Sequence, residues 1–211
     1  MNTMEPIRDQ RKIRELIKYV LDKGYKRDGI LILFALNTLL RVSDMIDIKY
    51  EQLFDRNGEV REYFDIQINK SKRRSKENGK IIKVKTRRIR LPNDFCKELK
   101  KYADDYGMTP GDYIFYSTEE PTQHVHRKTI WRRLSRYAHA VGVEKLGTHG
   151  LRKTGAFQLW KKGVPIRVIS QMLNHSSIAQ TLQYISIDQE MIDKAVESMN
   201  FSFSRILRNY E

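Results

Sequence analysis

The chain has 211 residues, 40% of them hydrophobic, which suits one or two compact domains with a substantial core. Its 40 Lys and Arg residues outnumber 26 Asp and Glu residues, so the formal net charge is +14, which favours a polyanionic partner. The single cysteine, Cys96, excludes an internal disulfide framework and a cysteine-based zinc site. The longest apolar run, residues 30–36, is too short to span a bilayer, and no targeting segment is visible, so we expect a cytoplasmic protein.

The first forty-five residues have the periodicity of helices. A first helix is predicted to open at Pro6 and to stop at Gly24. A more buried second helix is predicted over residues 28–40. We expect a third, short helix to begin near Ser43, whose hydroxyl can cap it.

The middle of the chain changes to the alternation of β-strands. Apolar residues alternate with polar ones from Tyr63 to Asn69, and again near the end of residues 81–91, with a charged loop over residues 71–80 between them. The stretch from Lys70 to Arg90 holds eleven Lys and Arg residues, a density that favours phosphate contacts. The basic side chains expected on the outer, DNA-facing side of this hairpin are Lys72, Arg73, Arg74, Lys83, Lys85, Arg87 and Arg88.

The remainder of the chain is predicted to be helical. Helices are expected from Asn93, over residues 129–141, over residues 148–160, from Pro165, from Ser177 and over residues 188–199. No repeat, linker or domain boundary is visible. The sequence therefore predicts one domain over residues 1–211, mainly helical with a small antiparallel β-sheet, in the α+β class.

Five residues carry chemistry when they are considered together. Arg41 and Arg152 can clamp a phosphate, and His149 and His175 can move protons or donate hydrogen bonds to it. The phenol of Tyr184 can attack phosphorus and form a covalent intermediate. Each residue alone has an ordinary structural explanation, but their order fits cleavage of a phosphodiester without a metal.

At these positions the chain resembles the tyrosine recombinase (phage integrase) family. Residues 39–44 are similar to its first-arginine box, and residues 149–152 (His-Gly-Leu-Arg) to its H-x-L-R box. Residues 172–176 resemble its L-G-H-S box, with Asn174 where the family usually has glycine. Residues 181–184 resemble its nucleophile segment. Asn174 is compatible with this motif because asparagine also tolerates the left-handed conformation.

The resemblance implies the integrase catalytic fold and a reaction that needs neither ATP nor a metal. Tyr184 forms a 3′-phosphotyrosyl link and releases a 5′-hydroxyl, while Arg41 and Arg152 neutralise the phosphate oxygens. His149 assists proton transfer at the phenol, and His175 donates a hydrogen bond to the phosphate. Attack by another 5′-hydroxyl then rejoins the DNA.

The catalytic lysine of the family lies in a β-hairpin, where this chain offers two candidates. Lys70 follows the first strand and keeps the closer spacing to Arg41, so it is preferred as the general acid; Lys85 is the alternative. Only about forty residues precede Arg41, so we expect no N-terminal core-binding domain.

Three functions are compatible with these residues. The preferred one is site-specific recombination, by integration, excision or inversion of DNA. The alternatives are relaxation of supercoils like that of type IB topoisomerases, and a catalytically silent DNA-binding regulator on the same fold. The expected partners are double-stranded DNA, further copies of the chain in a tetrameric synapse, and accessory DNA-bending proteins, which implies association with the nucleoid.

Overall fold

The structure, a computed structural model, describes residues 4–74, 81–144, 146–185 and 189–199. Within these ranges it describes the side chains of all residues except 69–74, 81–85, 189–190 and 194–195. The elements in chain order are α1 (Gln10–Asp22), α2 (Lys26–Thr38), α3 (Val42–Met45), α4 (Tyr50–Leu53), β1 (Tyr63–Arg74), β2 (Ile81–Arg90), α5 (Asn93–Asp105), α6 (Arg127–Ala140), α7 (Thr148–Lys161), α8 (Ile166–Leu173), α9 (Ile178–Ile185) and α10 (Gln189–Met199). The predicted α+β class, mainly helical with a small antiparallel sheet, is confirmed.

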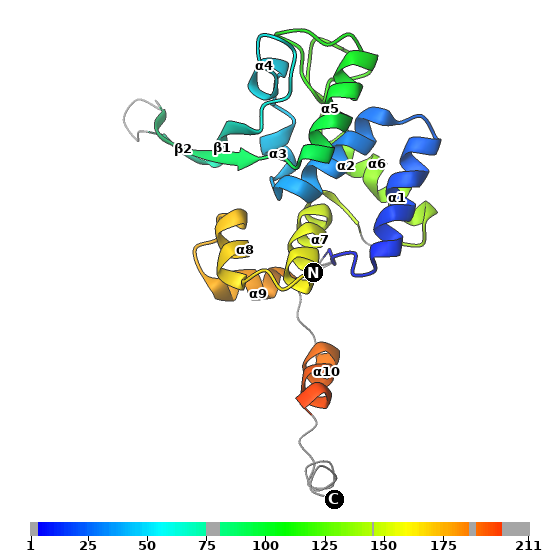
Figure 1. Cartoon of the computed structure of the whole chain (residues 1–211), viewed down its shortest axis with the longest axis vertical. Helices are drawn as coiled ribbons and strands as arrows, with labels where there is room; N and C mark the ends of the chain where they lie inside the picture. Colours follow the sequence, from blue (N-terminus) through cyan, green and yellow to red (C-terminus); the bar gives the residue numbers. More distant parts are fainter. Residues whose placement is uncertain (1–3, 75–80, 145, 186–188, 200–211) are drawn as a thin grey trace, which may run out of the picture.

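The two strands form an antiparallel hairpin that extends to one side of the helical body (Figure 1). Phe64 lies opposite Ile89, and Ile66 opposite Arg87. Phe64, Ile66, Ile68 and Ile89 are buried, as the alternation predicts, because this face of the hairpin packs on α3 and α4. The expected loop is shorter than residues 71–80, since β1 continues to Arg74.

The first helix begins later than predicted. Its N-cap is Asp9, whose side chain accepts a backbone hydrogen bond, and not a residue near Pro6. The segment before Asp9 lies along α7 instead. The Ile7 amide donates to Thr154 Oγ1 at 2.8 Å, and Gln158 Nε2 donates to the Ile7 carbonyl at 3.1 Å. These tertiary hydrogen bonds replace those of a first helical turn.

The turn from α2 into α3 positions Arg41. Leu39 ends α2 in the left-handed conformation with φ 53°, although it is a buried leucine. Arg41 then adopts an extended backbone and is the N-cap of α3, so the prediction that Ser43 caps this helix is wrong. Gly155 of α7 allows this turn, because a Cβ there would lie 2.8 Å from the Leu36 carbonyl oxygen.

Most of the later helices lie where they were predicted, with shifts of one or two residues at their N-termini. The N-cap of α5 is Pro92, one residue before the expected Asn93, and α6 begins at Arg127 because His126 accepts a backbone hydrogen bond as its N-cap. The short helix α4 was not predicted. Four residues carry too little periodicity to be recognised.

The C-terminal helices enclose a second core beside α7. Its buried members are Leu39, Ala156, Phe157, Ile169, Leu173 and Ile185. Asn174, the C-cap of α8, has φ 50°, which confirms that asparagine serves the left-handed position. Helix α10 stands apart from the body in Figure 1, and only Met191 at its start packs against this core among its described side chains. No helix among the described residues has the length and apolar character needed to cross a membrane.

Candidate active site

Arg41 and Asp44 form the first part of the site, at the start of α3. The Arg41 side chain is 17% exposed, and its Nη1 lies 4.0 Å from Asp44 Oδ2. Asp44 is 2% exposed. A buried carboxylate one turn further along the helix attracts the guanidinium and restrains it at the base of the hairpin.

Arg152 of α7 is almost fully buried, at 2% exposure. Its Nη2 donates a hydrogen bond to the carbonyl of Leu173, the last residue of α8. Its Nε has no hydrogen-bond partner among the described residues. Burial lowers the pKa of Arg152 to about 10, so the guanidinium still carries its charge at neutral pH. A buried charged donor without a partner indicates a place for an anionic ligand.

His175 follows α8 and is oriented by α9. Its Nδ1 lies 3.0 Å from Oγ1 of the buried Thr181. Burial lowers the pKa of His175 to about 4, and the charges of Arg152 and Arg41 act in the same direction. The imidazole is therefore neutral at pH 7, and its two nitrogens comprise one donor and one acceptor.

Tyr184 of α9 lies next to these groups. Its ring meets the His175 ring edge to face, with centroids 5.0 Å apart, and the Arg152 Cζ lies 6.0 Å from its centroid. On the same ring, Lys153 Nζ lies 5.6 Å from the centroid. Burial raises the pKa of the Tyr184 phenol, whereas Arg152 and Arg41 oppose that rise. The phenol is thus protonated at pH 7 and requires a base when it reacts.

The remaining predicted catalytic residues are His149, Lys70 and Lys85. His149, in the first turn of α7, is exposed and lines a cavity of ≈ 530 Å³ with Trp131 and Lys128. Lys70 lies in β1 and Lys85 in β2, where the register pairs Lys85 with Ile68. The side chains of both lysines lie outside the described part of the structure, as do those of Lys72, Arg73, Arg74 and Lys83.

The two hairpin arginines predicted to face DNA lie in different environments. Arg88 is exposed and pairs with Asp65, with Nε and Nη2 each 3.2 Å from a carboxylate oxygen. Arg87 is partly buried beside Arg41 and Asp44, so the prediction of an outer position is wrong for it. Its face was readable from the sequence, because residues 87 and 89 have the same parity and Ile89 is buried.

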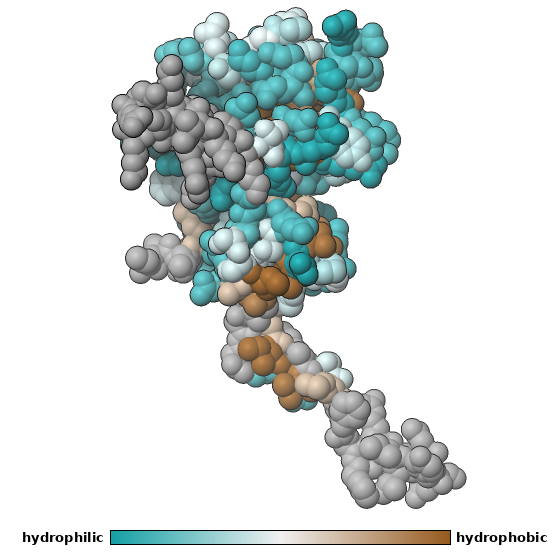
Figure 2. All heavy atoms as spheres, turned by 90° about the vertical axis from the view of Figure 1, so that its left-hand side faces the viewer, coloured by the Kyte–Doolittle hydropathy of each residue, from teal (hydrophilic) through white to brown (hydrophobic). Residues whose placement is uncertain are grey.

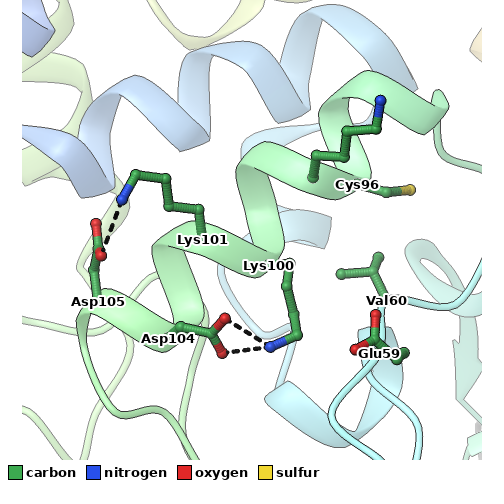
Figure 3. A pocket seen from close by; sticks show the side chains of 8 residues that line it. Glu59, Val60, Cys96, Lys100, Lys101, Asp104 and Asp105 are labelled. Carbon is green, nitrogen blue, oxygen red and sulfur yellow. Dashed lines mark hydrogen bonds and ion pairs between the residues drawn. The ribbon is translucent and has the colours of Figure 1, made fainter.

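A separate cavity, of ≈ 460 Å³, lies between α5 and the segment that contains Glu59 and Val60. Its lysines are occupied by neighbouring carboxylates, since Lys100 pairs with Asp104 and Lys101 with Asp105 (Figure 3). It contains none of the predicted site residues, and we assign it no function. Among the described residues, no group of His, Cys, Asp and Glu has the arrangement of a metal site.

The geometry thus defines a class of site: a cluster of buried or half-buried guanidiniums next to a neutral histidine and a tyrosine, which suits a phosphate ester. The sequence profile described as "Phage integrase family" matches residues 8–191, so this chain belongs to the phage integrase family of tyrosine recombinases. It is 31% identical over 192 residues to the probable integrase/recombinase YoeC of Bacillus subtilis (strain 168), covering 90% of this chain and 93% of YoeC.

Solved structures have the same fold. The crystal structure of XerA recombinase matches with a TM-score of 0.68 at 21% identity, covering 95% of this chain and 68% of that one. The XerH site-specific recombinase bound to palindromic difH substrate matches with a TM-score of 0.65 at 18% identity, covering 92% of this chain. This chain spans 53% of the XerH chain.

Proposed function

We propose that this chain is a site-specific recombinase that cleaves and rejoins double-stranded DNA through Tyr184. The main support for this proposal is that the Tyr184 ring contacts both His175 and Arg152. At pH 7 His175 is neutral and Arg152 is positively charged. This arrangement suits a nucleophile next to a bound phosphate. The net charge of +14 and the DNA-bound structure of XerH support DNA as the source of that phosphate.

In the proposed cleavage step, Tyr184 Oη forms a bond to phosphorus while the bond from phosphorus to the 5′-oxygen breaks. Arg41 and Arg152 stabilise the charge that accumulates on the non-bridging oxygens. His149 receives the phenol proton, and Lys70, with Lys85 as the alternative, protonates the departing oxygen. Attack by a 5′-hydroxyl of another strand reverses these steps, so the energy of the phosphodiester bond is conserved.

Covalent trapping on DNA of random sequence tests this function and identifies the DNA site in the same experiment. The full chain is incubated with a library of nicked duplexes, and DNA that stays attached to protein after denaturation is recovered and sequenced. Cleavage beside the nick releases a short strand, which prevents rejoining, so the covalent adduct accumulates. The DNA recovered with wild type should therefore be enriched in one specific site. Tyr184→Phe should yield no adduct and still shift the enriched DNA in a gel.

Tyr106→Phe is the matched control, because Tyr106 is an exposed tyrosine at the end of α5 and far from the site residues in sequence. It should form adducts at the wild-type rate. An adduct that persists in Tyr184→Phe would exclude Tyr184 as the nucleophile. DNA binding without any adduct in wild type would instead favour the catalytically silent regulator, and relaxation of supercoils without strand exchange would favour the topoisomerase-like activity.

A further inference from the structure

Arg87 lies on the inner face of the hairpin, next to the residues that are proposed to bind phosphate. It pairs with Ile66 in the strand register, and Ile66 is 4% exposed because β1 packs on α3. Arg41 and Asp44 belong to that same short helix and its N-cap. Arg87 is therefore directed to the base of the hairpin, where the turn after α2 places Arg41.

The charges around Arg87 show that it shares an electrostatic environment with both proposed phosphate clamps. Asp44 raises the pKa of Arg87, whereas burial, the largest influence, and Arg41 lower it. Arg87 in turn lowers the pKa of Arg152. Arg41, Arg87 and Arg152 are thus close enough to influence one another's charge, and the buried carboxylate of Asp44 acts on Arg87 and Arg152 and lies 4.0 Å from Arg41.

Arg87 also has unused hydrogen-bonding capacity. No hydrogen bond and no ion pair within 4.0 Å joins it to another group in the described part of the chain, although it is partly buried. The adjacent Arg88 is exposed and is already bound by Asp65. A guanidinium carries five N–H donors, and none of those of Arg87 is among the buried, unpartnered side-chain atoms of the described residues, so they remain open to a ligand. Arg87 thus differs from Arg88 in having donors that no carboxylate occupies.

We infer that Arg87 is a third phosphate-binding arginine of the active site and contacts the same scissile phosphate as Arg41 and Arg152. The inference rests on the proposed function. Three guanidiniums against one carboxylate leave two positive charges in excess, and His175 adds none because it is neutral. Arg87 would thus add positive charge to that of Arg41 and Arg152 where negative charge accumulates on the non-bridging oxygens in the transition state.

The test compares Arg87→Gln with Arg11→Gln, a control at an exposed arginine of α1, on the DNA site recovered by covalent trapping. On the normal phosphate, Arg87→Gln should slow adduct formation at least ~10-fold, in the lower part of the range for loss of one preorganised donor. On a scissile methylphosphonate, which lacks one negative charge, the deficit of Arg87→Gln relative to wild type should shrink to about 3-fold or less. Arg11→Gln should stay within about 3-fold of wild type on both substrates, because Arg11 is exposed on α1 and paired with Asp9 at the surface.

A deficit of Arg87→Gln that is equally large on both substrates would overturn the inference, since it would show that Arg87 acts by supporting the hairpin or Asp44. Normal cleavage by Arg87→Gln would overturn it as well. If Arg87→Gln has a lowered melting temperature, Arg87→Lys replaces it. That variant keeps the charge and loses the planar fork, so it should show a smaller deficit that is also reduced on methylphosphonate.

A second measurement separates this inference from the proposed function. Inorganic phosphate is titrated into the full chain while the arginine Nε–H signals are followed by NMR, with the Arg87, Arg152 and Arg11 signals identified by their loss in the corresponding Lys variants. The Arg87 and Arg152 signals should shift with one common dissociation constant, and the signal of Arg11, which is paired with Asp9 at the surface, should not follow them. This result would support the phosphate site even if wild type formed no adduct with DNA. An Arg87 signal that is unmoved by phosphate would refute the inference although cleavage occurs.

Discussion

At the scale of single residues, burial gives the site its protonation states. Burial removes water from Arg152 and His175 and lowers the pKa of both side chains. Arg152 nevertheless keeps its proton at pH 7, because its pKa of about 10 remains far above neutrality. His175, with a pKa of about 4, has lost its proton. The result is a fixed positive charge and a neutral imidazole beside one phenol.

The low pKa of His175 predicts a specific pH dependence of stability. An unfolded histidine has a pKa of about 6.5, so between pH 6.5 and 4 the unfolded chain binds a proton that the native chain does not. Native stability from the neutral His175 is thus fully present above pH 6.5 and is lost as the pH falls toward 4. Urea unfolding at pH 7 and at pH 5 should show a smaller loss on acidification for His175→Gln than for wild type.

His139→Gln is the control for this measurement, because His139 is an exposed histidine near the end of α6. It should retain the pH dependence of wild type. If His175→Gln and wild type lose the same stability between the two pH values, the imidazole is not held neutral by the fold.

The choice of general acid can also be decided at this scale. A 5′-bridging phosphorothiolate has a leaving group that needs little protonation, so it should rescue a variant that lacks the general acid. Lys70→Ala should cleave normal DNA slowly and the sulfur substrate at nearly the wild-type rate. Rescue of Lys85→Ala instead would place the acid on β2. Single-turnover adduct formation on the two substrates is the measurement.

At the scale of elements, the close approach of α2 and α7 determines how Arg41 and Arg152 are spaced. Gly155→Ala would place a methyl group 2.8 Å from the Leu36 carbonyl oxygen, a backbone atom that cannot move aside alone. We expect a net loss of about 1–3 kcal/mol in unfolding free energy, the usual cost of overpacking, despite the helix propensity of alanine. Adduct formation should fall as well, because α7 carries Arg152.

Gly150→Ala, in the same helix, is the matched control. Its nearest contact would be Leu146 Cδ1 at 2.8 Å, the far end of a flexible side chain, and its nearest backbone atom is 3.5 Å away. It should cost less than about 1 kcal/mol, because the leucine can move to another rotamer and alanine favours the helix. Equal unfolding midpoints for the two variants would show that the α2–α7 contact can relax.

At the scale of the whole molecule, we propose that α10 joins copies of the chain on DNA. Ile192, Val196 and Met199 are 48%, 57% and 59% exposed and gather on one side of this helix, where Figure 2 shows a hydrophobic patch. Among the side chains described for α10, only Met191 packs against the second core of its own domain. Recombination also requires several active sites at one synapse.

Deletion of the residues after Asp188 should therefore reduce cooperative assembly on DNA more than it lowers the melting temperature. Val196→Asp tests the same surface without removing Met191, and Glu197→Gln is its exposed control. We expect DNA affinity to fall steeply with salt in all of these variants, because they retain the basic hairpin residues that we predict to contact phosphate. Assembly that equals wild type, or a truncated chain that is unfolded, would exclude α10 as a partner-binding helix.

The amino-acid sequence by itself determined most of the helices, the hairpin, and the order of Arg41, Arg152, His175 and Tyr184. Helical period, strand alternation and motif spacing are local properties, so they can be recognised without the fold. The start of α1 and the cap of α3 were not predicted correctly from these local patterns. Both depend on contacts with α7, which is more than a hundred residues away in the chain.

Only the tertiary structure decided which groups of the site share one environment. The neutral state of His175 depends on burial by α9 and on the charges of Arg152 and Arg41, and no local pattern encodes these together. Strand alternation already places Arg87 and Arg88 on opposite faces of the hairpin, but only the packing of β1 on α3 brings Arg87 close to Arg41 and Asp44 and leaves Arg88 in solvent.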